Sequence, residues 1–317
     1  MNPEMLVRAK DTTNPSYGCE PGKRGMKEHI NKGVVNIDKP PGPTSHEVVA
    51  WIKRILHADK AGHSGTLDPR VTGVLPVMLG DATKAVGALL GDKEYICVMR
   101  LHRGVPAEKV AEVCSQFVGS IYQRPPLKSA VKRRIRKRKI YYLEVKEMEG
   151  NDILFRVGCE AGTYIRKLCH DIGKALGTGA HMAELRRTRA GSFTEATLTT
   201  LHELKDAYVF WEEGIEHPLR KVILPMEHAL EALPKIVIRD SAVDAICHGA
   251  DLAVPGVLSI QNGIRAGDQV VVFTLKGEAV CLSTAKMDSQ QMLYAKKGVA
   301  VDTDRVLMEP NTYPKGW

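Results

Sequence analysis

The sequence predicts an α+β protein with two domains, a large mixed domain followed by a small β-barrel. The chain has 317 residues, which is long enough for two cores, and 44% of them are apolar. Helical and strand-like patterns follow one another from Val34 to Leu233. After Pro234 the pattern changes to short strands separated by glycines.

The first predicted elements are a strand at Val34 to Ile37 and a helix that follows the turn at residues 38–43. Thr44 and Glu47 have the spacing of a capping box, and apolar residues follow them at helical intervals. Residues 1–32 are polar and show no periodicity. We interpret them as an N-terminal extension that is either ordered by a partner or by the second domain, or disordered.

One acidic side chain, Asp68, lies in the glycine-framed stretch from Gly62 to Pro69. The glycines of this stretch, together with Gly73, permit backbone angles that other residues resist. Pro69 lacks an amide hydrogen and keeps Asp68 out of the helical conformation. The pattern indicates a loop that holds one carboxylate in place, although an aspartate that only caps a turn is the alternative.

The remaining elements follow from periodicity and from glycine and proline positions. An apolar strand is expected directly after the loop, at residues 74–79. In the large domain we expect helices at 83–90, 106–117, 161–176, 198–204 and 222–233, and strands at 93–101, 141–145 and 153–159. In the small domain we expect strands at 236–238, 270–275, 280–285 and 299–307, and a helix at 241–248.

The net charge is +8, and seven cations lie in the run Lys132–Lys139. Like charges side by side repel one another unless a polyanion neutralises them. Because the run lies between predicted strands, we interpret it as an RNA-facing loop, with a solvated loop as the alternative. The cations that we expect to bind RNA are Lys132, Arg133, Arg134, Arg136 and Arg138.

Other classes of site and location have no support in the sequence. The seven cysteines show no C-x-x-C spacing and are expected to be buried thiols of a reducing compartment, which places the protein in the cytoplasm. No spacing typical of a metal site occurs, and Gly87 to Lys93 lacks the spacing of a phosphate-binding loop. We therefore expect no metal and no cofactor. No apolar run approaches the roughly 18 residues of a membrane span.

The motif at residues 62–75, GHSGTLDPRVTGVL, resembles the catalytic motif of TruB-type pseudouridine synthases. From Lys27 to Pro314 the chain resembles, more closely, the archaeal dyskerin-like catalytic subunits of box H/ACA ribonucleoproteins. The resemblance implies a catalytic domain of pseudouridine synthase type with a mixed, mostly antiparallel sheet at 33–233. It also implies an RNA-binding PUA domain at 235–312, after the extension of residues 1–32.

The resemblance implies roles for individual residues. Asp68 is expected to be catalytic, Tyr95 to stack on the target base, and Arg166 of the sequence GTYIR to pair with Asp68. Further substrate-binding residues are implied at Tyr164, Leu185, His63 and Lys39, and an RNA-binding residue of the barrel at Gly249. Core packing is the alternative for Leu185, a surface position in a turn for Lys39, and a hydrogen bond within the loop for His63.

The implied reaction converts uridine to pseudouridine. The C1′–N1 bond breaks and a C1′–C5 bond forms, and a carboxylate supports this by attack on the sugar or by glycal formation. The expected substrate is ribosomal RNA selected by a box H/ACA guide RNA, with a tRNA T-arm uridine as a guide-free substrate. The implied partners are two small H/ACA subunits and a kink-turn-binding protein. A stand-alone tRNA synthase and a non-catalytic RNA scaffold are the competing interpretations.

Overall fold

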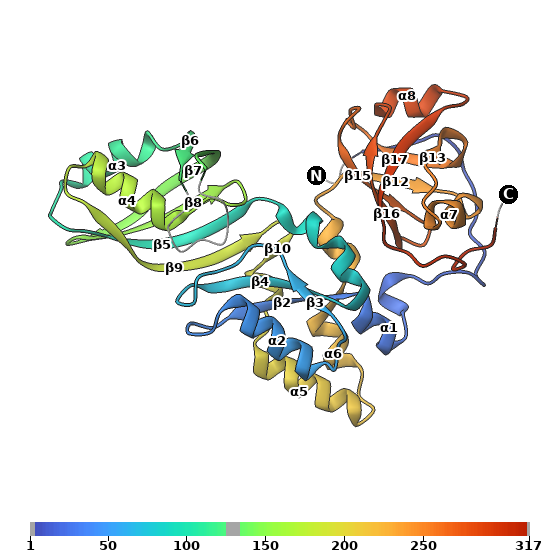
Figure 1. Ribbon diagram of the computed structural model, residues 1–317, viewed down its shortest axis with the longest axis horizontal. Coiled ribbons are helices and arrows are strands. Elements are labelled where there is room, and N and C mark those ends of the chain that lie inside the picture. Colours follow the sequence, from blue (N-terminus) through green and yellow to red (C-terminus); the bar gives the residue numbers. More distant parts are fainter. Residues whose placement is uncertain (1–3, 125–133, 316–317) are drawn as a thin grey trace.

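The computed structural model describes residues 4–124 and 134–315 and shows two sheet-based domains (Figure 1). The larger sheet is formed by β2 (Gly33–Lys39), β3 (Ala61–His63), β4 (Thr72–Leu79), β5 (Lys93–Leu101), β6 (Gly119–Gln123), β7 (Arg136–Glu149), β8 (Asp152–Cys159), β9 (Ala180–Ala190), β10 (Phe193–Thr194) and β11 (Ile223–Pro225). The strand order is β11-β2-β4-β9-β5-β8-β7-β6, with β3 paired to β4 and β10 to β9.

Within the described part of this sheet, one pair of strands is parallel. Thr72 and Gly73 at the start of β4 lie beside Arg186 and Arg187 of β9, and the other pairs are antiparallel. The predicted mixed, mostly antiparallel sheet is therefore confirmed. The parallel pair brings the end of the Asp68 loop next to the middle of β9.

Helices cover two parts of the larger sheet. They are α1 (Met26–Asn31), α2 (Ser45–Ile55), α3 (Ala107–Ser115), α4 (Ile165–Ala175), α5 (Leu201–Glu212) and α6 (His217–Val222). In Figure 1, α3 and α4 lie at the β5–β8 end, whereas α2, α5 and α6 lie below β2 and β4. The predicted capping box is present, because Thr44 accepts a bond from the Glu47 amide at 3.2 Å and Glu47 accepts one from the Thr44 amide at 2.7 Å.

The predicted helix at 222–233 is wrong. Helix α6 ends at Val222, the strand β11 follows, and a 3-10 helix, η4, spans Met226–Leu230. Ile223 is fully buried and pairs with Val35, so this segment completes the open edge of β2 instead of continuing a helix. Residues 80–90 are helical as expected, but in the tighter 3-10 form.

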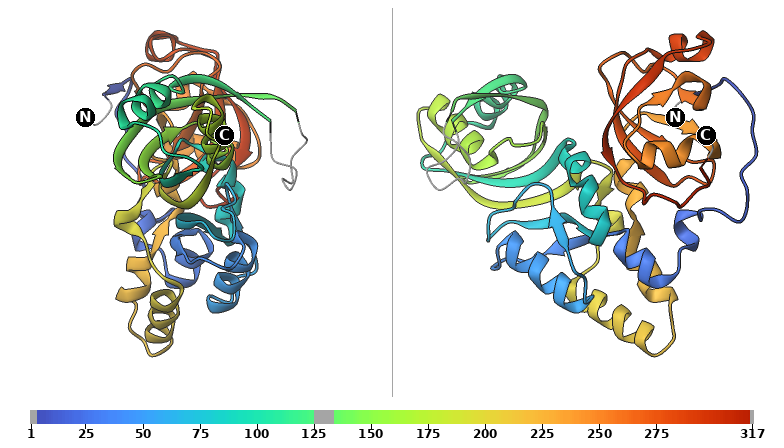
Figure 2. Two further views of the ribbon diagram at one scale, coloured as in Figure 1. Left: turned by 90° about the vertical axis from the view of Figure 1, so that its left-hand side faces the viewer. Right: turned by 45° about the vertical axis from the view of Figure 1, so that its right-hand side comes forward.

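The smaller domain is a curled sheet of β12 (Lys235–Ile238), β13 (Leu252–Ala253), β14 (Val257–Gln261), β15 (Gln269–Phe273), β16 (Ala279–Ala285) and β17 (Val299–Val306), with helices α7 (Asp240–Cys247) and α8 (Ser289–Tyr294). Its seventh described strand is β1 (Met5–Val7), which pairs with β14. The right-hand view of Figure 2 shows the N-terminal segment running along the outside of this domain to α1. The second domain therefore orders this part of the extension within the chain itself.

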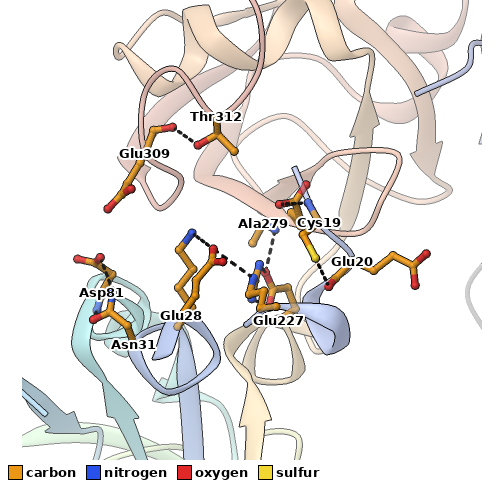
Figure 3. A network of polar contacts seen from close by, with 12 residues as sticks. Cys19, Glu20, Glu28, Asn31, Asp81, Glu227, Ala279, Glu309 and Thr312 are labelled. Carbon is orange, nitrogen blue, oxygen red and sulfur yellow. Dashed lines mark hydrogen bonds and ion pairs between the residues drawn. The ribbon is translucent and has the colours of Figure 1, made fainter. Parts of the chain in front are cut away.

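The two domains share an apolar core and a polar cluster. Apolar side chains of both domains form one buried group, which includes Val34, Val74, Met78, Met226, Leu230, Val271, Phe273 and Leu282. Beside this core, the Arg24 guanidinium binds both carboxylate oxygens of Glu227, at 3.0 and 2.6 Å. Glu227 also accepts a hydrogen bond from the Ala279 amide at 3.2 Å (Figure 3). The extension, the larger domain and the barrel thus meet at one carboxylate.

Two general features agree with the sequence. All seven cysteines are free, and six of them are buried, as expected for internal thiols. Among the described helices, none is long and apolar enough to cross a membrane.

The Arg24–Glu227 pair yields a test of domain docking. Glu227→Gln removes the charge that compensates the Arg24 guanidinium, of which only 3% is exposed. We expect the free energy of unfolding to fall by about 3 kcal/mol, because the buried cation keeps only the more distant Glu28, at 3.9 Å, among its ion-pair partners in the described residues. Urea unfolding measures the effect. Glu231→Gln is the matched control, since the Glu231 side chain is 53% exposed. Equal loss in both variants would contradict this account.

Candidate active site

The Asp68 loop connects β3 to β4 and presents its carboxylate to solvent. Gly65 and Gly73 adopt φ values of +86° and +99°, which side chains with a Cβ resist. The Val71 amide donates to the Asp68 carbonyl at 2.9 Å, so the chain turns tightly at the aspartate. The Asp68 side chain is 47% exposed. Glycines thus form the curve that sequence analysis predicted.

Arg166 lies opposite Asp68 and forms an ion pair with it. It occupies the first turn of α4, which begins at Ile165 after Tyr164. The Gln123 side chain binds both backbone polar groups of Tyr164. It accepts a hydrogen bond from the Tyr164 amide at 2.9 Å and donates one to the Tyr164 carbonyl at 3.1 Å. This anchor fixes the start of α4 and hence the base of the Arg166 side chain. The predicted Asp68–Arg166 pairing is present in the structure.

Tyr95 lies on β5 beneath the loop. It is 8% exposed and belongs to the same buried cluster as Leu67 and Val71. Burial raises the pKa of the Tyr95 hydroxyl, although the nearby Arg187 guanidinium opposes that effect. Leu185 packs against the same cluster from β9. Loop, tyrosine and leucine therefore share one apolar wall below the carboxylate.

Lys39 has a different role from the substrate contact that the resemblance implied. The side chain is fully buried, and its ammonium donates to the carbonyls of Pro40, Pro69 and Val71 at 2.8, 2.9 and 3.0 Å. An ammonium has three hydrogens, so none remains for a substrate. Lys39 therefore supports the loop from inside, and both the surface position and the substrate contact are wrong.

His63 lies at the end of β3, and its Nδ1 is buried without a hydrogen-bond partner among the described residues. Its ring meets that of His46 edge-on, with 5.2 Å between centroids. Burial, together with His46 and Arg187, lowers the pKa of His63 to about 4. The ring is therefore neutral near pH 7, and a hydrogen bond from Nδ1 within the loop is not formed.

Residues 136–139 of the cationic run form a strand, and the expected loop is wrong for them, whereas Arg134 and Ile135 lie outside any strand. Lys132 and Arg133 lie outside the described residues. Residues 136–139 belong to β7 and pair with β6, so their side chains alternate between half-buried and exposed positions. Arg138 is partly neutralised by Glu160, at 3.2 Å. Arg134 is exposed and Arg136 half-buried.

Gly249 follows α7 on the surface of the barrel. Its φ is +92°, and a Cβ built on it would meet no atom within 4 Å. The position is therefore open to a large ligand and conformationally suited to glycine.

Two buried cations near the loop were missed by sequence analysis. Arg187 is 1% exposed and Lys93 is 4% exposed. Burial and the repulsion of Arg187 lower the pKa of Lys93 to about 7. Both residues lie within sequence stretches that also carry the expected site residues, Tyr95 and Leu185. The sequence held one signal of their burial. Lys93 and Arg187 each lie two residues from an expected site residue on the same strand, Tyr95 and Leu185, and therefore on the same face of the sheet.

Comparison with protein families assigns nearly the whole chain. Residues 53–165 match the N-terminal domain of TruB family pseudouridylate synthases, and residues 166–231 match the C-terminal domain of tRNA pseudouridylate synthase B. Residues 234–307 match the PUA domain, and residues 2–49 match the DKCLD (NUC011) domain.

Similar proteins and structures extend over the full length. A "Probable tRNA pseudouridine synthase B" of Methanopyrus kandleri is 61% identical over 99% of this chain and 94% of its own length. The protein of the same description from Pyrococcus furiosus is 59% identical over 99% of this chain and 94% of its own. A crystal structure of a Cbf5-Nop10-Gar1 complex contains a chain with a TM-score of 0.94 and 59% identity, over 99% of this chain and 97% of that one.

A structure of an H/ACA RNP bound to a substrate RNA containing 2′-deoxyuridine has a similar chain, with a TM-score of 0.94 and 56% identity over 100% of this chain and 98% of that one.

The support from Lys39 yields a stability prediction. Lys39→Met removes the side-chain donor of the Pro40 and Val71 carbonyls, each worth roughly 1–3 kcal/mol when unsatisfied, whereas the Pro69 carbonyl keeps the Gly42 amide at 2.9 Å. We expect the unfolding midpoint in urea to fall and limited proteolysis to begin within residues 62–74. Lys60→Met, at an exposed position before β3, is the control. A wild-type midpoint for Lys39→Met would contradict the assignment.

The motif geometry, the two-domain fold and these full-length similarities agree, and the chain belongs to the TruB family of pseudouridine synthases, with a DKCLD segment before its catalytic domain and a PUA domain after it.

Proposed function

We propose that this chain isomerises uridine to pseudouridine with Asp68 as the catalytic residue, in ribosomal RNA selected by a box H/ACA guide RNA. The observation that carries the proposal is the Asp68–Arg166 ion pair, because it joins a glycine-framed loop and a helix start that are far apart in the sequence. A charge-assisted contact with a guanidinium orients a carboxylate, as a nucleophile requires.

The reaction begins when the target base leaves the RNA stack and enters the site. Tyr95 offers a ring for stacking, and Leu185 an apolar wall, which together offset part of the cost of unstacking. The carboxylate of Asp68 then supports departure of the base from C1′, by attack on the sugar or by glycal formation. After the base turns, C5 bonds to C1′. The C5 proton leaves and N1 gains one, so the isomerisation needs no other reactant.

Neighbouring residues complete the proposed pocket. The neutral ring of His63 can fill the space that the flipped base leaves in the RNA, and Tyr164 lines the start of α4. The cations Arg134, Arg136 and Arg138, with Lys132 and Arg133 beyond the described residues, are proposed to contact RNA phosphates. Phosphate contacts of this kind position an RNA but do not read its sequence. Base pairing with a guide supplies that selection.

The partners follow from the similar structures. Their descriptions name Nop10, Gar1 and a substrate RNA in H/ACA particles, so we propose that two such small subunits dock on the catalytic domain. A kink-turn-binding protein is proposed to join through the guide. The relatives come from archaea, in which RNA is made in the cytoplasm, and we place this protein there. We keep residues 33–233 as the catalytic domain and 235–312 as the PUA domain.

A second substrate has a specific basis. The curated relatives are described as tRNA pseudouridine synthases, so guide-free action on a tRNA T-arm uridine is proposed as well.

Asp68→Asn tests the catalytic assignment. The amide keeps the shape of the side chain but removes its charge and nucleophilicity, so pseudouridine formation should fall below detection while RNA binding stays within about twofold. Assays use a ribosomal RNA fragment with its guide and partners, and a tRNA without them. Asp59→Asn, at an exposed position before the loop, is the control and should retain full activity. Turnover by Asp68→Asn near the wild-type rate would remove Asp68 from the mechanism.

Guide anchoring is tested in the barrel. Gly249→Glu places a negative charge on the proposed RNA surface, and guide affinity should fall at least about tenfold through repulsion of the phosphates. Gly263→Glu is the matched control, because Gly263 is also exposed, has a φ of +88° and would meet no atom within 4 Å. Gel-shift titrations measure both. Equal affinities would place the guide elsewhere, and unchanged tRNA modification shows that the catalytic domain is intact.

A further inference from the structure

Arg187 reaches both ends of the Asp68 loop from β9. Its Nε donates to the Val74 carbonyl at 2.7 Å, and its Nη1 donates to the Gly65 carbonyl at 3.1 Å. Gly65 precedes Asp68 and Val74 follows it, so a single planar guanidinium spans the loop. The backbones of Gly73 and Arg187 are also in close contact, because a Cβ on Gly73 would lie 2.2 Å from the Arg187 carbonyl oxygen. The loop is therefore wrapped around this one residue.

The charge of Arg187 has no carboxylate partner among the described residues. Its Nη2 is buried without a hydrogen-bond partner, although the side chain is only 1% exposed. The adjacent Arg186 differs, since it pairs with Asp38 at 3.0 Å and with Glu195 at 2.6 Å. An uncompensated buried cation is costly, and the charge itself is therefore the feature that requires a reason.

Tyr95 lies directly across from Arg187. The two residues are register partners on the neighbouring antiparallel strands β5 and β9. The positive charge lowers the pKa of the Tyr95 hydroxyl against the effect of burial, so it favours negative charge at this wall. Lys93, two residues before Tyr95, adds a second buried side chain whose Cε would lie 3.7 Å from a Cβ on Gly65.

We propose that Arg187 is a positioning residue of the reaction, which fixes the Asp68 loop through two carbonyls and places a buried positive charge behind the ring on which the target base stacks. This inference rests on the proposed role of Asp68. When the C1′–N1 bond breaks, its electron pair leaves with the base, which becomes anionic. A cation held in a low-dielectric wall stabilises that charge without reorganisation during the reaction.

The test separates position from charge. Arg187→Lys keeps the charge but has no planar fork to bind two carbonyls, whereas Arg187→Met loses both functions at similar volume. Under single-turnover conditions with saturating RNA, we expect the rate to fall about 100-fold for lysine and at least about tenfold further for methionine. RNA affinity should stay within about twofold. Arg186→Lys, the neighbouring control, should remain within about threefold of wild type.

The charge has a spectroscopic readout. With ¹³C-labelled tyrosine and Tyr95→Phe for assignment, NMR titration should show a higher pKa for Tyr95 in Arg187→Met and little change in Arg187→Lys. A residue that only fills space would move neither the pKa nor the ratio of the two rates. If Arg187→Met does not fold, Arg187→Lys still decides the positioning role.

Several results would overturn the proposal. An Arg187→Lys protein that melts at a lower temperature but reacts at the wild-type rate would refute the role of the two carbonyl bonds in the reaction and leave them a structural role only. Unchanged Tyr95 titration in Arg187→Met would remove the role of its charge. The failure of this inference can be distinguished from the failure of the proposed function. An active Asp68→Asn protein refutes the proposed function. An inactive Asp68→Asn protein together with a fully active Arg187→Lys protein refutes only the positioning role of Arg187.

Discussion

Five backbone carbonyls point inward around the Asp68 loop, and two buried cations bind all of them. Lys39 binds those of Pro40, Pro69 and Val71, and Arg187 binds those of Gly65 and Val74. The carbonyls of Pro40, Gly65, Pro69 and Val71 lie outside the strands, and that of Val74 belongs to β4. A buried carbonyl without a donor is costly, so the cations determine the path of the chain. The backbone of the loop thus places the carboxylate, and the ion pair with Arg166 orients its side chain.

The sheet topology brings the remaining groups to this loop. Tyr95 is on β5, Leu185 and Arg187 are on β9, and the parallel pairing of β4 with β9 joins them to the loop. Arg166 arrives from the other direction, at the start of α4, where Gln123 of β6 anchors the preceding peptide. The site therefore depends on contacts between segments that are about 100 residues apart. Such a site forms only when the whole larger domain is folded.

Sequence patterns predicted the parts of the molecule that depend on local chemistry. The capping box at Thr44, the glycine turns around Asp68 and the change to short strands after Pro234 each follow from residues that are close together in the chain. The resemblance to known synthases added the Asp68–Arg166 pair, which no local pattern contains. The strand at Ile223–Pro225 was read as helix because an apolar run alone does not reveal an unfilled sheet edge.

The buried cations show the same limit more clearly. Lysine and arginine are usually surface residues, so residue type alone predicts that Lys39, before two prolines, and Arg187, in an arginine-rich stretch, are exposed. Their burial depends on carbonyls contributed by distant segments, which only the fold makes visible. Likewise residues 136–139 of the basic run form a strand because β6 pairs with them. Their positive charge did not allow this pairing to be predicted from the sequence.

The apolar core shared by the two domains has a consequence for how the chain unfolds. Val34, Val74 and Met78 of the larger domain pack in one group with Val271, Phe273 and Leu282 of the barrel, and β1 adds a strand of the N-terminal extension to that barrel. We therefore expect the molecule to unfold as one thermodynamic unit, with a single heat-absorption peak in calorimetry. Removal of residues 235–317 would expose the apolar surface of the larger domain that this core covers. The shortened protein would then aggregate, so its loss of RNA binding would not measure RNA anchoring by the barrel.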